Sequence, residues 1–221
     1  MATAGAAAGV TFVGRQVVRS RDRVKAYGEV FTPAYMVDQM LDLVREDLEV
    51  GPDFVDRTFL EPAAGNGNFL VAILRRKLAA IEKEIPPELW RQESLFALAS
   101  IYGIELLPDN HAEARAAMLA TFANFHGNHG VAPESDALLH RAAAFLIDTN
   151  VIRGNTLTGM TTEGIEIEFS WWHRVPDRAG AVQREPFSFT SLRGDAFDFN
   201  LYTAYQVCPI DRVHEEVGAD V

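Results

Sequence analysis

The sequence contains a single cysteine, Cys208, which excludes an intramolecular disulfide and a zinc site built from several thiolates. It has no apolar stretch that approaches membrane-spanning length. Its first residues, MATAGAAAGVTFVG, lack the basic start and strong apolar run of a signal peptide. The histidines show no spacing typical of metal ligands. We therefore expect a cytoplasmic protein with no membrane contact and no metal.

The chain also lacks an excess of basic residues. Its 20 Lys and Arg residues are outnumbered by 31 Asp and Glu residues, which gives a net charge of −11. A protein that grips nucleic acid unaided usually carries a basic excess, because phosphate contacts dominate the affinity. The one local exception, RQVVRSRDRVK at 15–25, is interpreted as a solvated arm, with a phosphate-contacting arm as the alternative.

Apolar residues make up 48% of the 221 residues, enough for one well-filled core. Helical periodicity covers 68–85, 87–99, 108–125 and 136–147, and the apolar stripe from Met36 to Leu48 is expected to be core. Short β-like runs lie at 58–61, 99–107 and 150–155. This alternation predicts an α/β fold with a Rossmann-like, mostly parallel sheet and helices on both faces.

The character of the sequence changes after residue 160. GIEIEFSWW places Ile165, Ile167, Phe169 and Trp171 on one face of a strand, and EPFSFTSL is a second β-like run. We therefore expect three parts: an N-terminal arm (1–27), the Rossmann-like domain (28–160) and a small C-terminal β-rich extension (161–221). One of two adjacent strand residues usually faces the core, so a packing role is predicted for the Trp171–Trp172 pair rather than base stacking.

The stretch FLEPAAGNGNFL, at 59–70, joins a predicted strand to a predicted helix through Gly65 and Gly67. Glycines there permit positive φ and a close approach of the backbone to a ligand. The dinucleotide fingerprint requires a third glycine where this chain has Leu70. The acid Glu61 also disfavours a diphosphate and suits the ammonium of a methionine moiety. S-adenosylmethionine fits this loop, and Glu105, at the end of the next strand, is suited to its ribose hydroxyls.

These residues carry a resemblance to a known family. FLEPAAGNGNFL resembles motif I of the amino-methyltransferases, and SIYGIELLPDNHAEARAAML resembles their motif II. GEVFTPAYMVDQML resembles motif X, which precedes motif I in N6-adenine DNA methyltransferases of restriction–modification systems, and VIRGNTLTG resembles motif III. The chain therefore resembles class I S-adenosylmethionine-dependent methyltransferases over roughly residues 26–160, with the motifs in the family's γ order.

The resemblance implies roles for individual residues around S-adenosylmethionine. Three residues would border its methionine end: Phe31, Thr32 and Pro33. Four would shape the cofactor loop: Glu61, Ala63, Gly65 and Gly67. Glu105 would accept hydrogen bonds from the ribose, Leu106 would lie beside the adenine, and the amide oxygen of Asn155 would accept a hydrogen bond from the adenine amino group.

The chain departs from the family where catalysis is concerned. It has no Asn/Asp-Pro-Pro-Tyr/Phe tetrapeptide, the motif that accepts hydrogen bonds from the target amine and stacks on the flipped base. The nearest string, FDFNLYTAY, offers Asn200 and Tyr202 as weak catalytic candidates, and its spacing is one residue short. The chain is thus expected to be the cofactor half of the fold, with the remainder supplied elsewhere or absent.

Three hypotheses follow from these motifs. The first is an N6-adenine DNA methyltransferase, or its cofactor-binding subunit, that reaches DNA through a partner subunit or an oligomer. The second is a non-catalytic, methyltransferase-like scaffold subunit of a phage or bacterial DNA modification or defence system, which the missing tetrapeptide and the acidic charge favour. The third is a methyltransferase with another acceptor, such as a small molecule or a protein.

Overall fold

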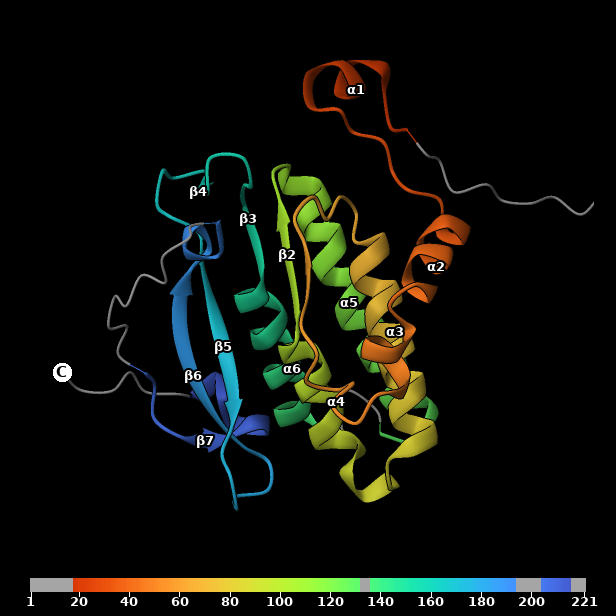
Figure 1. Cartoon of the computed structure of the whole chain (residues 1–221), viewed down its shortest axis with the longest axis vertical. Coiled ribbons are helices and arrows are strands. Elements are labelled where there is room, and N and C mark those ends of the chain that lie inside the picture. The colour runs from red at the N-terminus through yellow and green to blue at the C-terminus, as the bar shows by residue number, and fades with distance from the viewer. Residues whose placement is uncertain (1–17, 132–135, 194–203, 216–221) are drawn as a thin grey trace, which may run out of the picture.

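The structure is a computed structural model that describes residues 18–131, 136–193 and 204–215 (Figure 1). Its longer helices are α1 (Arg21–Tyr27), α2 (Ala34–Asp42), α3 (Asn68–Glu84), α4 (Trp90–Ala99), α5 (Pro108–Asn128) and α6 (Ala137–Asn150). Short helical turns form η1 (Glu46–Val50), η2 (Pro87–Leu89), η4 (Phe189–Arg193) and η5 (Ile210–Glu215). The helices predicted from apolar periodicity correspond to α2 through α6, with ends shifted by a few residues.

The larger sheet of the described residues has four strands in the order β1-β2-β3-β4. They are β1 (Phe59–Glu61), β2 (Ile101–Glu105), β3 (Val151–Asn155) and β4 (Met160–Thr161). β1, β2 and β3 run parallel, whereas β4 pairs with β3 in the antiparallel direction. The chain therefore has an α/β fold with a mixed sheet, in which the three predicted strands are neighbours in sequence order.

One face of this sheet is packed against helices. Ile101 and Val151 belong to the main apolar cluster, which also takes its residues from α3, α4, α5 and α6. Gly103 lies on the same face of β2, and a Cβ atom there would come within 2.9 Å of the Leu70 side chain of α3. The lack of a side chain at Gly103 thus lets α3 lie close to the strand.

The other face carries a second sheet instead of helices. Antiparallel strands β5 (Glu168–Arg174), β6 (Ala181–Ser188) and β7 (Cys208–Pro209) form it. Tyr102 and Ile104 of β2 pack there against Phe169 and Phe187 of this sheet and against Ile167, which directly precedes β5. The prediction of helices on both faces is therefore wrong for this face among the described residues, because the expected β addition covers it (Figure 1).

That cover does not extend over β1. Leu60 pairs with Tyr102 in the parallel register, so its side chain lies on the same face of the sheet as that of Tyr102. The Leu60 residue is nevertheless 39% exposed, whereas Tyr102 is 5% exposed. In the described part of the chain β1 is also the terminal strand of its sheet. The sheet therefore ends at β1 with an uncovered apolar residue.

The two adjacent tryptophans both have packing roles, as predicted. Trp171 stacks on Phe187 of the neighbouring strand, with ring centroids 4.4 Å apart and an interplanar angle of 16°. The indole N–H of Trp172 donates a hydrogen bond of 2.9 Å to the side-chain oxygen of Asn150 on α6. Trp171 thus links two strands of the second sheet, and Trp172 links that sheet to α6.

The stripe from Met36 to Leu48 is core only in part. Val37, Leu41 and Leu48 are buried, but Met36 and Met40 are 42% and 51% exposed. The apolar positions extend more than halfway around α2, so the helix cannot turn all of them to one core. α2 also begins at Ala34 with Pro33 as its N-cap, and Thr32 provides no side-chain cap.

None of the helices in the described residues is both long and apolar enough to cross a membrane. In the same residues, no group of three or more His, Cys, Asp and Glu side chains is placed to hold a metal ion.

Because His126, near the end of α5, is buried, we expect the protein to lose stability in mild acid. The histidine is 2% exposed, and its Nε2 lies 2.9 Å from the Ser94 hydroxyl. Burial lowers its pKa to about 4, and the positive charge of Arg91 acts in the same direction. The unfolded chain then binds more protons than the folded one between pH 6.5 and pH 4, so stability falls as the pH falls through that window.

We expect wild type to lose about 1.5 kcal/mol more stability than His126→Gln between pH 6.5 and pH 5. Urea unfolding at each pH measures the difference. His173→Gln is the control, because the His173 side chain is 54% exposed, and it should retain most of the wild-type pH dependence. Equal pH dependence in wild type and His126→Gln would contradict the assignment.

Candidate functional site

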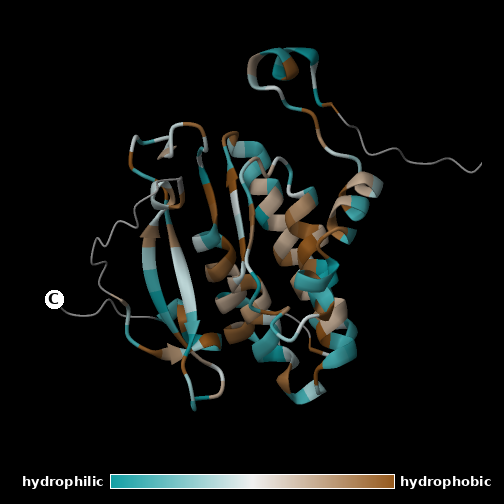
Figure 2. Cartoon of the chain, viewed as in Figure 1, coloured by the Kyte–Doolittle hydropathy of each residue, from teal (hydrophilic) through white to brown (hydrophobic). Residues whose placement is uncertain are grey.

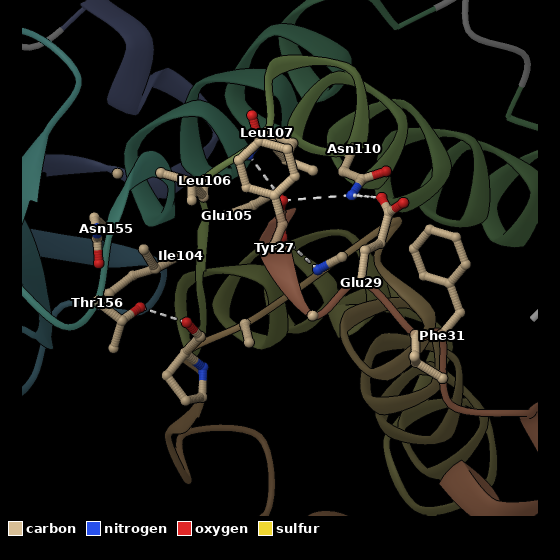
Figure 3. A pocket seen from close by; sticks show the side chains of 16 residues that line it. Tyr27, Glu29, Phe31, Ile104, Glu105, Leu106, Leu107, Asn110, Asn155 and Thr156 are labelled. Atoms are coloured by element: carbon tan, nitrogen blue, oxygen red, sulfur yellow. Dashed lines mark hydrogen bonds between the residues drawn. The ribbon is translucent and has the colours of Figure 1, made fainter. Parts of the chain in front are cut away.

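A pocket of about 250 Å³ lies at the carboxyl ends of the parallel strands (Figure 3). Its residues come from the segment before α2, the β1–α3 loop, the β2–α5 connection and the end of β3. They are Tyr27, Gly28, Glu29, Val30, Phe31, Pro62, Ala63, Gly65, Ile104, Glu105, Leu106, Leu107, Asn110, Gly154, Asn155 and Thr156. In α/β proteins this edge of a parallel sheet is the usual place for a ligand.

Many of the residues singled out in the sequence meet in this pocket. Those that line it are Phe31, Ala63, Gly65, Glu105, Leu106 and Asn155. Those that do not are Thr32, Pro33, Glu61 and Gly67. The Glu61 carboxylate accepts a hydrogen bond of 3.0 Å from the Ala63 N–H, and burial raises its pKa. Thr32 instead accepts a hydrogen bond from the Asn68 side chain through its carbonyl oxygen.

The glycine loop brings its backbone to the pocket wall. Gly65 has a φ of +55°, a conformation that costs other residues energy. A Cβ atom at Gly65 would also lie 3.3 Å from the Phe31 ring, so the ring and the loop backbone are in close contact. Just before Gly65, Ala64 donates its backbone N–H to the Ile104 carbonyl at 2.9 Å. The turn is thereby tied to β2, the strand that carries Glu105.

Glu105 connects the loops on either side of it. The residue is 7% exposed. One carboxylate oxygen accepts the Gly65 N–H at 2.7 Å, and the other accepts the Leu107 N–H at 2.9 Å. Asn110 approaches the second oxygen at 3.4 Å. A carboxylate offers about four lone-pair sites, so the three contacts leave one site for a ligand, and a second where Asn110 keeps only its shorter hydrogen bond to Glu29.

Glu29 and Asn110 are site residues that the sequence analysis missed. Glu29 is 8% exposed and accepts hydrogen bonds of 2.6 Å from Arg23 and 2.7 Å from the Asn110 amide. The hydrogen bond from Arg23 is the main cause that lowers the pKa of Glu29. Glu29 lies within GEVFTPAYMVDQML and Asn110 within SIYGIELLPDNHAEARAAML, the stretches that resemble motifs X and II. Neighbouring motif residues were thus the only available signal for them.

The basic segment at 15–25 is held on the protein where the structure describes it. Arg23 also bridges to Asp109 at 2.7 Å, and this hydrogen bond is the main cause that lowers the pKa of Asp109 to about 2. Arg19 pairs with Asp109 at 2.7 Å and with Glu113. The interpretation of these two arginines as a solvated arm is therefore wrong, because acidic groups of the α5 first turns pair with them.

The charge of the pocket lining favours a cationic ligand over a phosphate. Its residues include two carboxylates, Glu29 and Glu105, and none of the lining residues named above is Lys, Arg or His. Arg23 pairs with Glu29, which leaves Glu105 without a cationic partner among the described residues. Phosphate sites instead need N–H donors and positive charge.

Asn155 closes the pocket at the end of β3. Its amide oxygen accepts the Leu157 N–H at 2.9 Å, which fixes the side chain in a local turn. The amide oxygen keeps a second lone pair for another donor. Beside it, the Thr156 hydroxyl donates to the Pro62 carbonyl, which joins the β3 end to the glycine loop.

No family model, curated protein or solved structure matches this chain. The interpretation of the site therefore depends on its own residues. The catalytic candidates Asn200 and Tyr202 lie outside the described residues, so the structure does not place them relative to the pocket.

Proposed function

We propose that this chain binds S-adenosylmethionine and acts as an N6-adenine DNA methyltransferase or as the cofactor-binding subunit of one. The observation that carries the proposal is the buried Glu105 carboxylate at the end of β2, in a pocket whose lining residues include no basic side chain. The Rossmann-like interpretation of the parallel strands β1 to β3 belongs to the same proposal, since such sheets bind nucleotides at this edge.

The proposal assigns a task to each part of the pocket. The remaining lone pairs of Glu105 accept hydrogen bonds from the two ribose hydroxyls. Leu106 and Ile104 offer apolar contact to the adenine, and Asn155 accepts a hydrogen bond from its amino group. The Phe31 ring and the loop at Gly65 border the methionine end, in a pocket whose lining residues include no cation that would repel a sulfonium and an ammonium.

The bound cofactor supplies an electrophilic methyl group, and the residues of this chain bind and orient it. No covalent enzyme intermediate is needed, because an amine can attack the methyl group directly. Orientation of this kind is a large part of catalysis when two reactants must meet in line.

Two observations favour the subunit form of the proposal. The described pocket lining contains no counterpart of the Asn/Asp-Pro-Pro-Tyr/Phe group that accepts the target amine. The net charge of −11 also disfavours unaided DNA binding. A partner that supplies the catalytic group and the basic surface accounts for both.

Isothermal titration of the full chain with S-adenosylmethionine tests the binding step. We expect saturable binding with one site, and transfer of a tritiated methyl group to unmethylated DNA when the partner is present. Absence of binding would contradict the methyltransferase forms of the proposal and would leave the non-catalytic scaffold, which the missing tetrapeptide favours. Binding with transfer to a protein or a small molecule would support the third hypothesis.

Glu105→Gln is expected to weaken S-adenosylmethionine binding by about 5- to 150-fold, or about 1–3 kcal/mol. The amide keeps the shape of the side chain but removes its charge, and its NH₂ group faces a backbone N–H at Gly65 or Leu107. Glu61→Gln is the matched control, with an expected change below about threefold, because Glu61 does not line the pocket. A strong effect at Glu61 with none at Glu105 would reverse the assignment.

A further inference from the structure

α1 lies beyond the carboxyl ends of the parallel strands, apart from the other helices (Figure 1). None of its residues is buried, and Figure 2 shows hydrophilic residues over much of the helix. A helix this short is not stable by itself. Its last residue, Tyr27, nevertheless lines the pocket, as do Gly28 and Glu29 directly after it. We call residues 19–28 the strap, and contacts other than a buried apolar face must hold it there.

Ion pairs attach the strap to the rest of the protein. Arg23 donates to Glu29 at 2.6 Å and to Asp109 at 2.7 Å. Arg19 donates to Asp109 at 2.7 Å and also pairs with Glu113. Both of these α5 acids lie in the first turns of the helix, so the strap is fastened beside the pocket. Charged groups thus determine where the end of α1 lies.

Tyr27 presents an aromatic ring to the pocket. The lining residues include one other aromatic residue, Phe31, which is 8% exposed and in close contact with the loop at Gly65. Tyr27 is 57% exposed, so its ring has surface available for a ligand. Figure 3 shows this ring directed away from Phe31, toward the side of the pocket that carries Leu106 and Leu107. That side is the one assigned above to the adenine.

The apolar surface on this side of the pocket suits a planar base. Leu106 is 39% exposed although it lines the pocket. A base held between Leu106 and the Tyr27 ring would remove apolar surface of both side chains from water. Stacking of a base on an aromatic ring adds to this gain and needs no hydrogen bond. Neither the ribose nor the methionine chain of the ligand has a flat face of this kind.

We propose that Tyr27 stacks on the base of the bound nucleoside and that the ion-paired strap positions its ring. The inference rests on the proposed function, since it takes the ligand to be S-adenosylmethionine. The competing arrangement places the sulfonium or the ammonium over the ring face as a cation–π contact. The direction of the ring, away from Phe31 and the methionine end, favours the base.

Isothermal titration of full-length variants with S-adenosylmethionine tests the contact. We expect Tyr27→Ala to weaken binding at least about fivefold and Tyr27→Phe to stay within about twofold of wild type, because phenylalanine keeps the ring face. Tyr35→Ala is the matched control, since Tyr35 is 65% exposed and does not line the pocket. If wild type binds and Tyr27→Ala binds as tightly as Tyr35→Ala, the inference is overturned and the proposed function stands. Absence of binding by wild type would contradict both.

Adenosine, as a second ligand, shows which part of the cofactor meets the ring. It carries the base and the ribose but neither the sulfonium nor the ammonium. We expect Tyr27→Ala to weaken the binding of adenosine and of S-adenosylmethionine by the same factor, because both present the base. A loss for S-adenosylmethionine alone would place the ring against a cationic group and overturn the stacking assignment.

Arg19→Gln tests the strap. It removes the ion pairs with Asp109 and Glu113 without changing a residue that lines the pocket. We expect it to weaken binding by about twofold or more in wild type and to have no further effect in Tyr27→Ala, which has no ring to position. Arg21→Gln is the matched control for charge, because Arg21 is exposed on α1 and has no ion pair among the described residues. Equal losses from Arg19→Gln with and without the Tyr27 ring would overturn the positioning role.

Discussion

Replacing Lys77 with methionine is expected to lower the free energy of unfolding by about 3–5 kcal/mol. Lys77 lies on α3, and its exposure is 0%. Its ammonium donates to three backbone carbonyls, those of Phe54, Val55 and Arg57, at 2.7–2.9 Å. The Ser100 hydroxyl is a fourth acceptor at 2.8 Å. Methionine fills a similar volume but leaves these oxygens without a donor.

The effect is large because the Lys77 ammonium alone donates hydrogen bonds to three backbone carbonyls of one loop. The segment before β1 turns its carbonyls inward, and buried carbonyls without partners are costly. Burial lowers the pKa of Lys77 to about 7. The four oxygen acceptors oppose this change, because the ammonium form has three donors for them. The Phe59 ring, with its centroid 5.2 Å from the nitrogen, adds a cation–π contact.

Chemical denaturation of the full chain measures the effect. Lys83→Met is the matched control, because Lys83 lies on the same helix and its side chain is 80% exposed. That change should alter stability by less than about 0.5 kcal/mol. If Lys77→Met were as stable as Lys83→Met, the ammonium would not be holding the segment before β1.

Several parts of the fold could be predicted because the signals are local. The three parallel strands and the helices between them each have an apolar pattern of their own period. Glu105 was predictable for the same reason, since a strand followed by a helix-starting proline places its last residue at the sheet edge. The glycine pair was equally local, and both Gly65 and Gly67 have positive φ.

Other parts depend on contacts between distant residues and were not predictable. The cover over Tyr102 and Ile104 comes from strands that begin more than sixty residues later in the chain. Their alternating pattern predicts strands but does not say which face of which sheet they pack against. Glu29 and Asn110 are 81 residues apart and form one hydrogen-bonded pair. No local pattern distinguishes them from a loop acid and a helix-start amide.

The second large effect is expected at the glycine loop itself. Gly67→Ala should lower the free energy of unfolding by about 3–4 kcal/mol. Gly67 is the N-cap of α3 and has a φ of +87°. A Cβ atom there would lie 2.8 Å from the Cα atom and 2.9 Å from the Cβ atom of Ala114 on α5. The second glycine of the motif is therefore explained by helix packing, since it does not line the pocket.

Gly130→Ala separates the two causes. Gly130 has a φ of +82° and nothing within 4 Å of the position of a Cβ atom. Its substitution should cost about 1–2 kcal/mol, from backbone strain alone. The difference between the two variants then measures the contact of α3 with α5. If both cost the same, Gly67 would be required for its backbone conformation only, and α5 would yield to the added methyl group. If Gly67→Ala costs more, as we expect, the close packing of α5 against Gly67 fixes the turn that shapes the pocket. α5 begins just after Glu105, and its first turn carries Asn110.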